Sequence, residues 1–533
     1  MRLPARLALV LLSALVLAAC PSEEPAPPPP ADSFCTQHGW TERAFITEGV
    51  FGDRRRDLAD DFWVETTAGR WSFDEQWTGC ETYLFVPDTL RVSPLDNTPL
   101  LDSEADLAQL IETSPDNVHY FFVTAGDADA FADAMSERID DVTDALQDAD
   151  RDWWRDRLHV VAVSWTDLGG WVERAMSSSG EGFGIDRFQH IRAIGQLADV
   201  TRYSTALNNS GNWPWEANLA YVAHEALYWN YESDRQDQLD AVDWTEVWVF
   251  YDENIAATGN SLATVQLPDA AAMSGFDTML LDVRHNCDTG SREFGNCDAW
   301  DANNNVHLCD DPENPDACNT LLGRFITTYH REGRWLVDST ENLPFLAAGG
   351  ERRIRYIGAR GGHYTSVRIL LANTGKGGAP FKIDLLWEGG NWSEDYDANH
   401  PPITIDVPAD ATKVHLQVTL SGHGQNEDDN CAEFCNHVHT FTINGVEHVA
   451  DHPNMGDREG CLKQIDQGSV PNQHGTWWFE RSSWCPGKQV DPWVWDITDL
   501  VTPGQPTTIT YTTNRGQLDD GNINLQSWVT YWR

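Results

Sequence analysis

The stretch "CAEFCNHVHTFTING", residues 431–445, combines a two-cysteine motif with the start of a β-strand pattern. Cys431 and Cys435 lie four residues apart, with Glu433 midway between them. The segment "HTFTING" (439–445) then alternates polar and apolar residues, which predicts a short strand with one buried face. Two cysteines at this spacing are compatible with a disulfide, a redox pair or a metal site, so the choice depends on the rest of the chain.

The same alternating pattern recurs throughout the C-terminal half, where glycine, proline, asparagine and aspartate separate short apolar runs. Such strands without helices between them are typical of all-β sandwiches. We therefore predict two jelly-roll domains, over residues 257–375 and 376–533. Their predicted strands are 278–284, 323–330, 365–372, 413–422, 439–445, 507–514 and 527–532.

Residues 35–256 have a different pattern, in which strand-like and helical segments alternate. A helical periodicity covers 127–154, and strand-length apolar runs occupy 81–87, 118–125, 158–165 and 246–252. This alternation predicts an α/β domain. The overall fold class is therefore mixed, with an N-terminal α/β domain followed by two all-β jelly-roll domains.

The segment 58–88 resembles the opening of a thioredoxin-like or peroxiredoxin-like domain. Those proteins use a low-pKa cysteine after the first central strand, whereas Cys80 precedes the strand here and no Cys-x-x-Cys occurs. We therefore favour a structural or binding role for this domain over a redox role.

The N-terminus predicts export and membrane anchoring. Residues 1–19 have a basic start and a short apolar run that ends in "LAAC", which resembles a bacterial lipoprotein signal with Cys20 as the lipidated residue. Residues 20–34 form a proline-rich tether. These features predict a lipid-anchored protein of the bacterial cell envelope, facing the periplasm or the surface of the outer membrane.

The charge of the chain excludes one class of partner. The 533 residues include 36 basic and 83 acidic side chains, which gives a net charge of −47. Such a chain repels phosphate backbones, so we expect no nucleic-acid partner. We expect the protein to be a monomer.

Export favours disulfides over free thiols. The chain has 11 cysteines, and setting Cys20 aside leaves ten, an even number. Pairing neighbours is the simplest hypothesis, although the sequence leaves the connectivity open. The predicted pairs are Cys35 with Cys80, Cys287 with Cys297, Cys309 with Cys318, Cys431 with Cys435, and Cys461 with Cys485.

A bond between Cys431 and Cys435 requires the chain to curl. An extended strand would separate their α-carbons by ~13 Å, whereas a disulfide needs about 4.4–6.8 Å. Glu433 would then project from a tight, rigid loop. The alternative is a metal site that includes His437 and His439, because a His-x-His pair suits copper. The helix-like "HEALYWN" (224–230) lacks the second histidine of a zinc-protease motif.

Three segments resemble the C-terminal domain of the bacterial peptide-N-glycosidase F family: "CAEFCNHVHTFTING" (431–445), "GCLK" (460–463) and "GTWWFERSSWCPGKQVDPWVWDITDL" (475–500). The upstream segments 283–301 and 323–356 resemble the domain that precedes it, so the likeness spans about 260–533. By this resemblance Glu433 is an active-site glutamate, Asp301 is the principal catalytic aspartate and Cys461 is the partner of Cys485.

The resemblance implies two adjacent eight-stranded jelly rolls with the active site between them. It implies hydrolysis of the amide bond between asparagine and the first N-acetylglucosamine of an N-glycoprotein or glycopeptide, without a metal or cofactor. Asp301 would orient or deprotonate the water, Glu433 would act across the interface through a water, and Arg481 would stabilise negative charge or hold a carboxylate. The expected substrate-binding residues are Trp300, His423, Phe434, Trp477, Trp478 and Trp484.

The chain departs from the family pattern at several positions. The third acidic residue of the family falls near Ile357 and Gly358, where no carboxylate stands, and Ala302 replaces the arginine after the catalytic aspartate. Phe434 and His423 stand where the family has tryptophan. These changes imply a different glycan or a low activity. Two other hypotheses remain, namely a non-catalytic glycan- or protein-binding lipoprotein and a copper-dependent monooxygenase that uses His437 and His439.

Overall fold

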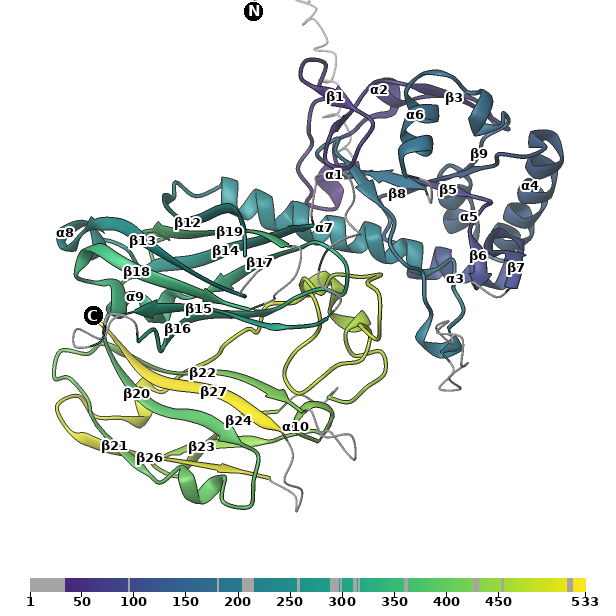
Figure 1. Cartoon of the computed structure of the whole chain (residues 1–533). Helices are drawn as coiled ribbons and strands as arrows, with labels where there is room; N and C mark the ends of the chain where they lie inside the picture. The colour runs from purple at the N-terminus through teal and green to yellow at the C-terminus, as the bar shows by residue number, and fades with distance from the viewer. Residues whose placement is uncertain are drawn as a thin grey trace, which may run out of the picture.

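The computed structural model describes residues 34–93, 96–179, 182–203, 215–255, 259–287, 297, 300–309, 314, 317–358, 363–424, 431–451, 455–514 and 521–533. The signal, the lipidation residue Cys20 and most of the tether lie outside these residues. The chain forms an N-terminal α/β domain and two β-domains stacked beside it (Figure 1). No helix within the described ranges is long and apolar enough to cross a membrane.

A five-stranded sheet forms the centre of the N-terminal domain. Its order is β11 (Ile191–Ala193), β10 (Phe183–Ile185), β5 (Thr82–Pro87), β8 (Val118–Val123) and β9 (Leu158–Val160). β5, β8 and β9 are parallel, while β10 is antiparallel to β5. Every residue of β5 and β8 is buried because helices cover both faces, which explains their continuous apolar sequences.

The main helices of this domain are α3 (Glu104–Thr113), α4 (Ala128–Asp144), α5 (Asp148–Arg155), α6 (Gly170–Ser179) and α7 (Tyr221–Asp240). The predicted helical segment 127–154 is thus two helices, α4 and α5. Short elements complete the domain: α1 (Phe34–Gln37), β1 (Phe51–Gly52), β2 (Leu58–Ala59), β3 (Trp63–Thr66), β4 (Gly69–Ser72), α2 (Phe73–Gln76), β6 (Arg91–Ser93) and β7 (Asp96–Pro99). The thioredoxin-like resemblance stays a prediction. Cys80 lies just before β5 and is bonded to Cys35.

The first jelly roll consists of two four-stranded sheets. One has the order β12 (Thr245–Asn254), β19 (His363–Ala372), β14 (Thr278–Cys287) and β17 (Gly333–Asp338). The other has the order β13 (Asn260–Asp269), β18 (Gly349–Ile357), β15 (Asn303–Cys309) and β16 (Thr320–Ile326). Two short helices, α8 (Ala270–Met273) and α9 (Leu343–Leu346), join strands in this domain.

The structure corrects one predicted boundary. We assigned residues 246–252 to the N-terminal domain as its last strand, whereas β12 pairs with β19 in the first jelly roll. Val247, Val249 and Phe250 belong to the core of that domain. The first jelly roll therefore begins near residue 245 instead of 257, because an apolar run alone does not identify the sheet in which a strand pairs.

The second jelly roll also consists of two four-stranded sheets, with the orders β20–β27–β22–β25 and β21–β26–β23–β24. Their bounds are β20 (Pro380–Asn391), β21 (Ile403–Asp406), β22 (Lys413–His423), β23 (His439–Ile443), β24 (Val446–Ala450), β25 (Trp493–Asp496), β26 (Pro506–Thr513) and β27 (Asn522–Trp532). Arg324 on β16 joins the two jelly rolls by donating hydrogen bonds to the Ser421 Oγ at 3.1 Å and the Asn524 carbonyl at 2.6 Å.

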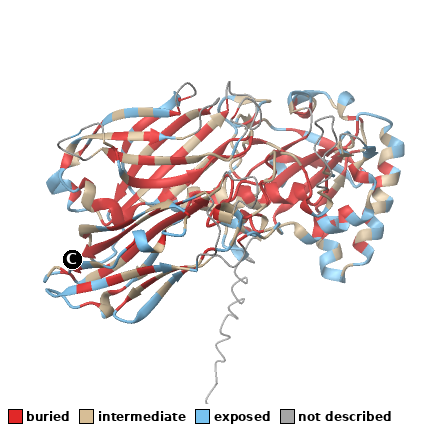
Figure 2. Ribbon diagram, turned by 60° about the horizontal axis from the view of Figure 1, so that its bottom comes forward, coloured by how far each residue is buried: buried red, intermediate tan, exposed pale blue. Residues whose placement is uncertain are grey.

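The long connection from β24 to β25 lies beside α7, as Figure 1 shows. On α7, Glu225 is fully buried and forms a two-pronged ion pair with Arg331, at 2.9 and 2.7 Å. Asn472 in the connection donates hydrogen bonds to Glu225 and to the Tyr221 carbonyl. Buried residues continue from the jelly rolls through this region into the N-terminal domain (Figure 2).

Candidate active site

The predicted disulfide between Cys431 and Cys435 closes the one-turn helix α10 (Cys431–Phe434). The two α-carbons are 4.7 Å apart, so the chain curls as the disulfide requires. The backbone N–H of Ser482 donates to the Glu433 carbonyl at 2.6 Å, and the N–H of Gly424 donates to the Glu433 carboxylate at 3.1 Å. Glu433 therefore has a fixed backbone and one fixed carboxylate oxygen. The other four predicted disulfides also form.

Thr327 holds the segment that contains Asp301. The Thr327 hydroxyl accepts a hydrogen bond from the Ala302 N–H at 2.7 Å and donates one to the Trp300 carbonyl at 2.8 Å. The Thr327 N–H donates to the Ala302 carbonyl at 3.0 Å. These three bonds bracket Asp301 on both sides and fix the direction in which its side chain leaves the backbone.

Arg481 brings the two carboxylates together. Its Nη2 lies 3.2 Å from the Asp301 carboxylate and 3.0 Å from the Tyr329 hydroxyl, and its Nε lies 3.9 Å from the Glu433 carboxylate. Its Nη1 donates to the Thr476 carbonyl at 2.9 Å. Asp301 comes from the first jelly roll, while Glu433 and Arg481 come from the second, so the site spans the junction between them.

The burial of these groups shapes their chemistry. The Arg481 side chain is 1% exposed, whereas those of Asp301 and Glu433 are 15% and 16% exposed. A buried guanidinium thus faces two carboxylates that solvent and ligands can still reach. Burial raises the pKa of Tyr329 far above its ordinary value, although the charge of Arg481 lowers it and that of Asp301 raises it. The Tyr329 hydroxyl therefore stays protonated beside the site.

Two of the predicted substrate-binding residues are open to solvent next to the carboxylates. Trp300 is 70% exposed and Phe434 is 37% exposed. The Phe434 ring lies 5.6 Å from the Arg481 guanidinium carbon, and Trp300 directly precedes Asp301. Both rings are therefore placed where a ligand at the carboxylates could contact them.

Three other aromatic residues that we expected to bind substrate are buried instead. Trp477 and Trp478 have no exposed surface and pack in the core of the N-terminal domain, where Trp478 contacts Tyr203. Trp484 is also buried, and its indole N–H donates to the Gly422 carbonyl at 2.8 Å. None of these three rings offers a face to a sugar, because domain packing uses the apolar surface that we expected to bind substrate.

His423 stacks on Trp484, with ring centroids 5.0 Å apart, and one of its ring nitrogens lies 2.9 Å from the Ser421 hydroxyl. Burial lowers the pKa of His423 to about 3, so the ring is neutral at ordinary pH. His423 thus packs against the Trp484 ring. We expect it to affect a ligand only indirectly, by holding Trp484 in position.

The proposed copper ligands have structural contacts instead. The two ring nitrogens of His437 lie 2.6 Å from the Cys431 carbonyl and 3.0 Å from the Ser482 hydroxyl. His439 contacts the Tyr511 hydroxyl at 2.6 Å. Cys431 and Cys435 are bonded to each other, so they are not free thiolates. Among the described residues there is no group of three or more His, Cys, Asp or Glu side chains that could hold a metal ion.

The structure explains one departure from the family pattern. A Cβ at Gly358 would lie 1.4 Å from the side-chain oxygen of Asn304. Asn304 is buried, accepts a hydrogen bond from the Tyr356 hydroxyl at 2.8 Å and donates one to the Ala302 carbonyl at 3.0 Å. Asn304 therefore excludes any side chain at position 358, and it supports the backbone next to Asp301.

Three residues that complete the site were not predicted from the sequence: Thr327, Tyr329 and Ser482. The first two lie in the segment 323–330, which we interpreted only as a strand, and Ser482 directly follows Arg481. Their contacts link segments about 25 to 150 residues apart, as in the 152-residue separation of Tyr329 and Arg481. The one usable signal was that Ser482 adjoins a predicted site residue.

The geometry defines a class of protein, a pair of jelly rolls with an acidic site and one buried arginine at their junction. Residues 391–530 match the family model described as "Peptide-N-glycosidase F, C terminal". The match includes Glu433 and Arg481 and confirms the resemblance for this part of the chain. The match lies within the second jelly roll. No curated protein matches the chain.

Three solved structures are similar to the chain. A peptide-N(4)-(N-acetyl-β-D-glucosaminyl) asparagine amidase has 19% identity and a TM-score of 0.44, over 54% of this chain and 96% of that chain. PNGase F, a glycosylasparaginase from Flavobacterium meningosepticum, has 18% identity and a TM-score of 0.41, over the same shares. PNGF-II has 15% identity and a TM-score of 0.42, over 54% of this chain and 65% of that chain.

Proposed function

We propose that the chain is an amidase that hydrolyses the bond between the asparagine side chain and the first N-acetylglucosamine of an N-glycoprotein or glycopeptide. The observation that carries this proposal is the convergence of Asp301 and Glu433, from two domains, on the buried Arg481. The family match over residues 391–530 supports it, because that match includes two of the three residues.

The proposed reaction starts with a water held by Asp301. This carboxylate takes a proton from the water as the oxygen attacks the amide carbon. The positive charge of Arg481 stabilises the negative charge that develops at the site. Glu433 contacts the substrate or the departing nitrogen through a second water. The carbon–nitrogen bond then breaks, the nitrogen takes up a proton, and aspartate and a glycosylamine are released.

The carboxylates are suited to these roles by their partial exposure. A water or substrate can reach Asp301 and Glu433, while the burial of Arg481 keeps its charge poorly screened and therefore effective at short range. Trp300 and Phe434 are the proposed contacts for the sugar, because they are the exposed aromatic rings beside the two carboxylates.

We also propose that the protein is exported and anchored by a lipid at Cys20. The five disulfides of the described chain support an oxidising compartment outside the cytoplasm. Mass spectrometry of the protein from a bacterial membrane fraction tests the anchor, and a Cys20→Ser variant that still partitions with the membrane would contradict it.

The decisive test of the amidase proposal is glycan release from a denatured N-glycoprotein, with and without a chelator. We expect chelator-resistant release that is lost in Asp301→Asn, together with conversion of the asparagine to aspartate. An Asp301→Asn variant with wild-type activity would refute the site assignment. Activity that a chelator abolishes would instead favour a metal-dependent oxygenase.

A non-catalytic glycan-binding protein is the second candidate. The observation that favours it is the Asn304 side chain, which excludes a carboxylate at position 358. Retention on an N-glycopeptide column without any release in the assay above would support this candidate over the amidase.

A further inference from the structure

A cavity of about 340 Å³ lies at the seam between the N-terminal domain and the first jelly roll. Three arginines line it: Arg55 and Arg56 from the N-terminal segment, and Arg284 from β14. Two acidic residues, Asp252 and Glu332, share the wall with them. The wall therefore has one more positive than negative charge, in a chain whose net charge is −47.

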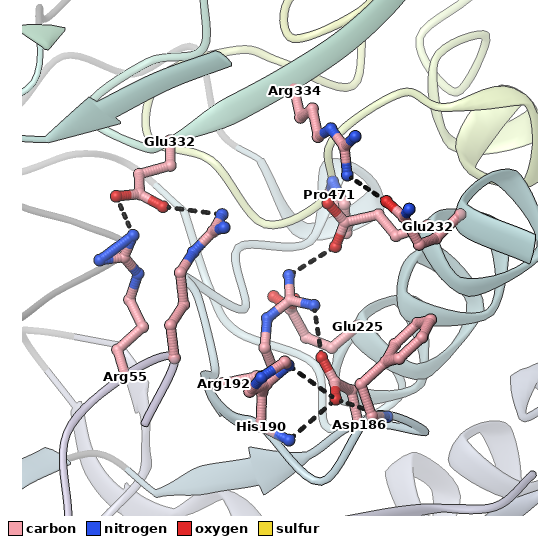
Figure 3. Close-up of polar contacts among 12 residues, drawn as sticks. Arg55, Asp186, His190, Arg192, Glu225, Glu232, Glu332, Arg334 and Pro471 are labelled. Carbon is pink, nitrogen blue, oxygen red and sulfur yellow. Dashed lines mark hydrogen bonds and ion pairs between the residues drawn. The ribbon is translucent and has the colours of Figure 1, made fainter. Parts of the chain in front are cut away.

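The acidic residues of the wall are already engaged. Glu332 pairs with Arg55 (Figure 3) and, at 3.2 Å, with Arg56. It also accepts a hydrogen bond from the Cys287 N–H. Asp252 accepts a hydrogen bond from the Asn286 side chain at 3.2 Å. One carboxylate is thus shared between two arginines, and neither acid forms an ion pair with Arg284 among the described residues.

Arg284 is the unusual member of the group. Its Nε is buried without a hydrogen-bond partner, and no ion pair forms at its guanidinium among the described residues. Burial lowers the pKa of Arg284, and the guanidinium groups of Arg56 and Arg334 lower it further, whereas Asp282 and Glu332 act in the opposite sense. Arg284 is half-buried, and a partly desolvated charge without an ion-pair partner among the described residues would gain from an anion.

The sheet directs the other wall residues into the same space. Arg284 pairs with Ser366 in the β14–β19 register, and Asn286 pairs with Tyr364, so these four side chains share one face of the sheet. Arg56 and Asp252 have left-handed backbones, with φ of 65° and 50°. Non-glycine residues in this conformation are uncommon and gather at ligand-binding sites, and two of them lie on this wall.

From these observations we propose that the cavity binds a small hydroxylated organic molecule with one oxyanion, such as a sugar with a carboxylate or phosphate. Arg284 and Arg56 would hold the oxyanion, and Tyr364, Asn286 and Asp252 would contact the rest of the ligand. The volume lies at the lower end of the range of about 300–1,000 Å³ for ligand pockets. An inorganic oxyanion would fill only part of it.

This proposal does not depend on the amidase function, because it is tested by binding alone. The full exported chain is titrated by calorimetry with glucose 6-phosphate, N-acetylneuraminic acid, neutral N-acetylglucosamine, inorganic phosphate and inorganic sulfate. We expect both acidic sugars to bind and the neutral sugar not to bind. Inorganic phosphate and sulfate should bind more weakly than the acidic sugars.

Arg284→Gln should weaken the binding of both acidic sugars at least about tenfold, because a hydrogen bond to a charged group contributes that much or more. The variant loses no hydrogen bond or ion pair of the described chain and removes a poorly compensated charge, so its thermal midpoint without ligand should not fall. The control is Arg174→Gln on α6, where the arginine is exposed and donates a hydrogen bond to the Gly170 carbonyl. Tyr364→Leu should weaken the binding of the acidic sugars and leave the binding of inorganic phosphate unchanged.

Three results would overturn the proposal. The first is no binding of either acidic sugar at up to roughly 10 mM. The second is equal affinity of wild type and Arg284→Gln. The third is inorganic phosphate that binds as tightly as glucose 6-phosphate, which would make the cavity a site for inorganic ions only.

Discussion

The segments around Asp301 and Glu433 position a carboxylate at the same arginine by different physical means. In the first jelly roll, side-chain and backbone hydrogen bonds from Thr327 fix an open segment around Asp301. In the second, the disulfide between Cys431 and Cys435 closes a single helical turn around Glu433. The covalent ring fixes the backbone turn, and hydrogen bonds from Ser482 and Gly424 complete the position of Glu433, whereas the segment around Asp301 depends on hydrogen bonds alone.

Replacement of Arg481 by lysine should have the largest effect, because it affects both carboxylates at once. Lysine keeps the charge but cannot contact Asp301, Glu433 and the Thr476 carbonyl from one planar group. We expect kcat to fall by about 10²–10³, the usual effect of removing a charge-stabilising donor. Activity within a factor of a few of wild type would show that Arg481 is only structural. Arg174→Lys on α6 is the matched control.

Removal of two disulfides should separate activity from stability. The ring closed by Cys431 and Cys435 spans a sequence separation of 4, and that of Cys461 and Cys485 spans 24. Loop-closure entropy predicts losses of about 2 and about 3.5 kcal/mol in unfolding free energy, respectively. We expect the Cys431→Ser, Cys435→Ser double variant to lose at least about tenfold in kcat, because Glu433 loses its fixed direction.

The Cys461→Ser, Cys485→Ser double variant should show the larger drop in denaturant midpoint. Its activity at low temperature is the informative measurement. If this variant loses more activity than the Cys431→Ser, Cys435→Ser variant while still folded, the short ring is merely a staple and does not position Glu433.

Replacement of Thr327 by valine tests whether hydrogen bonds from Thr327 position Asp301 in the first jelly roll. Valine has nearly the same shape but removes the hydroxyl bonds to the Ala302 N–H and the Trp300 carbonyl. Leaving these groups without a partner costs about 1–3 kcal/mol, and we expect about a tenfold fall in kcat from the misplaced Asp301. Thr327→Ser keeps the hydroxyl and should restore most of the activity. Equal activities of the two variants would contradict this role.

The last prediction concerns the stability of the fold at low pH. Burial lowers the pKa values of His423 and His439 to about 3 and that of His437 to about 4. The unfolded chain takes up protons on these rings below about pH 6.5, whereas the folded chain does not until pH 3–4. Stability is therefore fully present above about pH 6.5 and falls as the pH drops toward 4.

The measurement is the urea midpoint at several pH values between 7.5 and 4.5. His423→Gln removes one titrating ring and should flatten the decline by on the order of 1 kcal/mol per pH unit. A wild-type slope in this variant would mean that other groups cause the acid sensitivity.

Local patterns allowed much of the fold to be predicted from the sequence. The strands 278–284, 365–372 and 413–422 lie within β14, β19 and β22, because alternation within a strand is visible in its own residues. The five disulfides and the convergence of Asp301, Glu433 and Arg481 were also expected. The catalytic roles of these three residues stay predictions.

Features that depend on contacts between domains could not be predicted. Much of α7 is buried around its circumference, including the polar residues His224 and Glu225, so it has no amphipathic stripe to recognise. Trp477 and Trp478 lie in a motif that resembles a catalytic family, and nothing local indicates that their rings pack into another domain. The arginines of the seam cavity come from segments more than two hundred residues apart, such as those of Arg55 and Arg284.

The core that Trp477 and Trp478 share with the N-terminal domain has a consequence for the order of synthesis. Tyr221 on α7 and Asn472 in the connection are in contact although 251 residues separate them. At about 5–20 residues per second, roughly 10–50 s pass between the emergence of these two residues. During that interval the apolar surface of the α/β domain stays uncovered. The connection that contains Arg481 covers this surface only after it has been synthesised. A chain that ends before residue 477 would therefore lack part of the core of its first domain and also its active site.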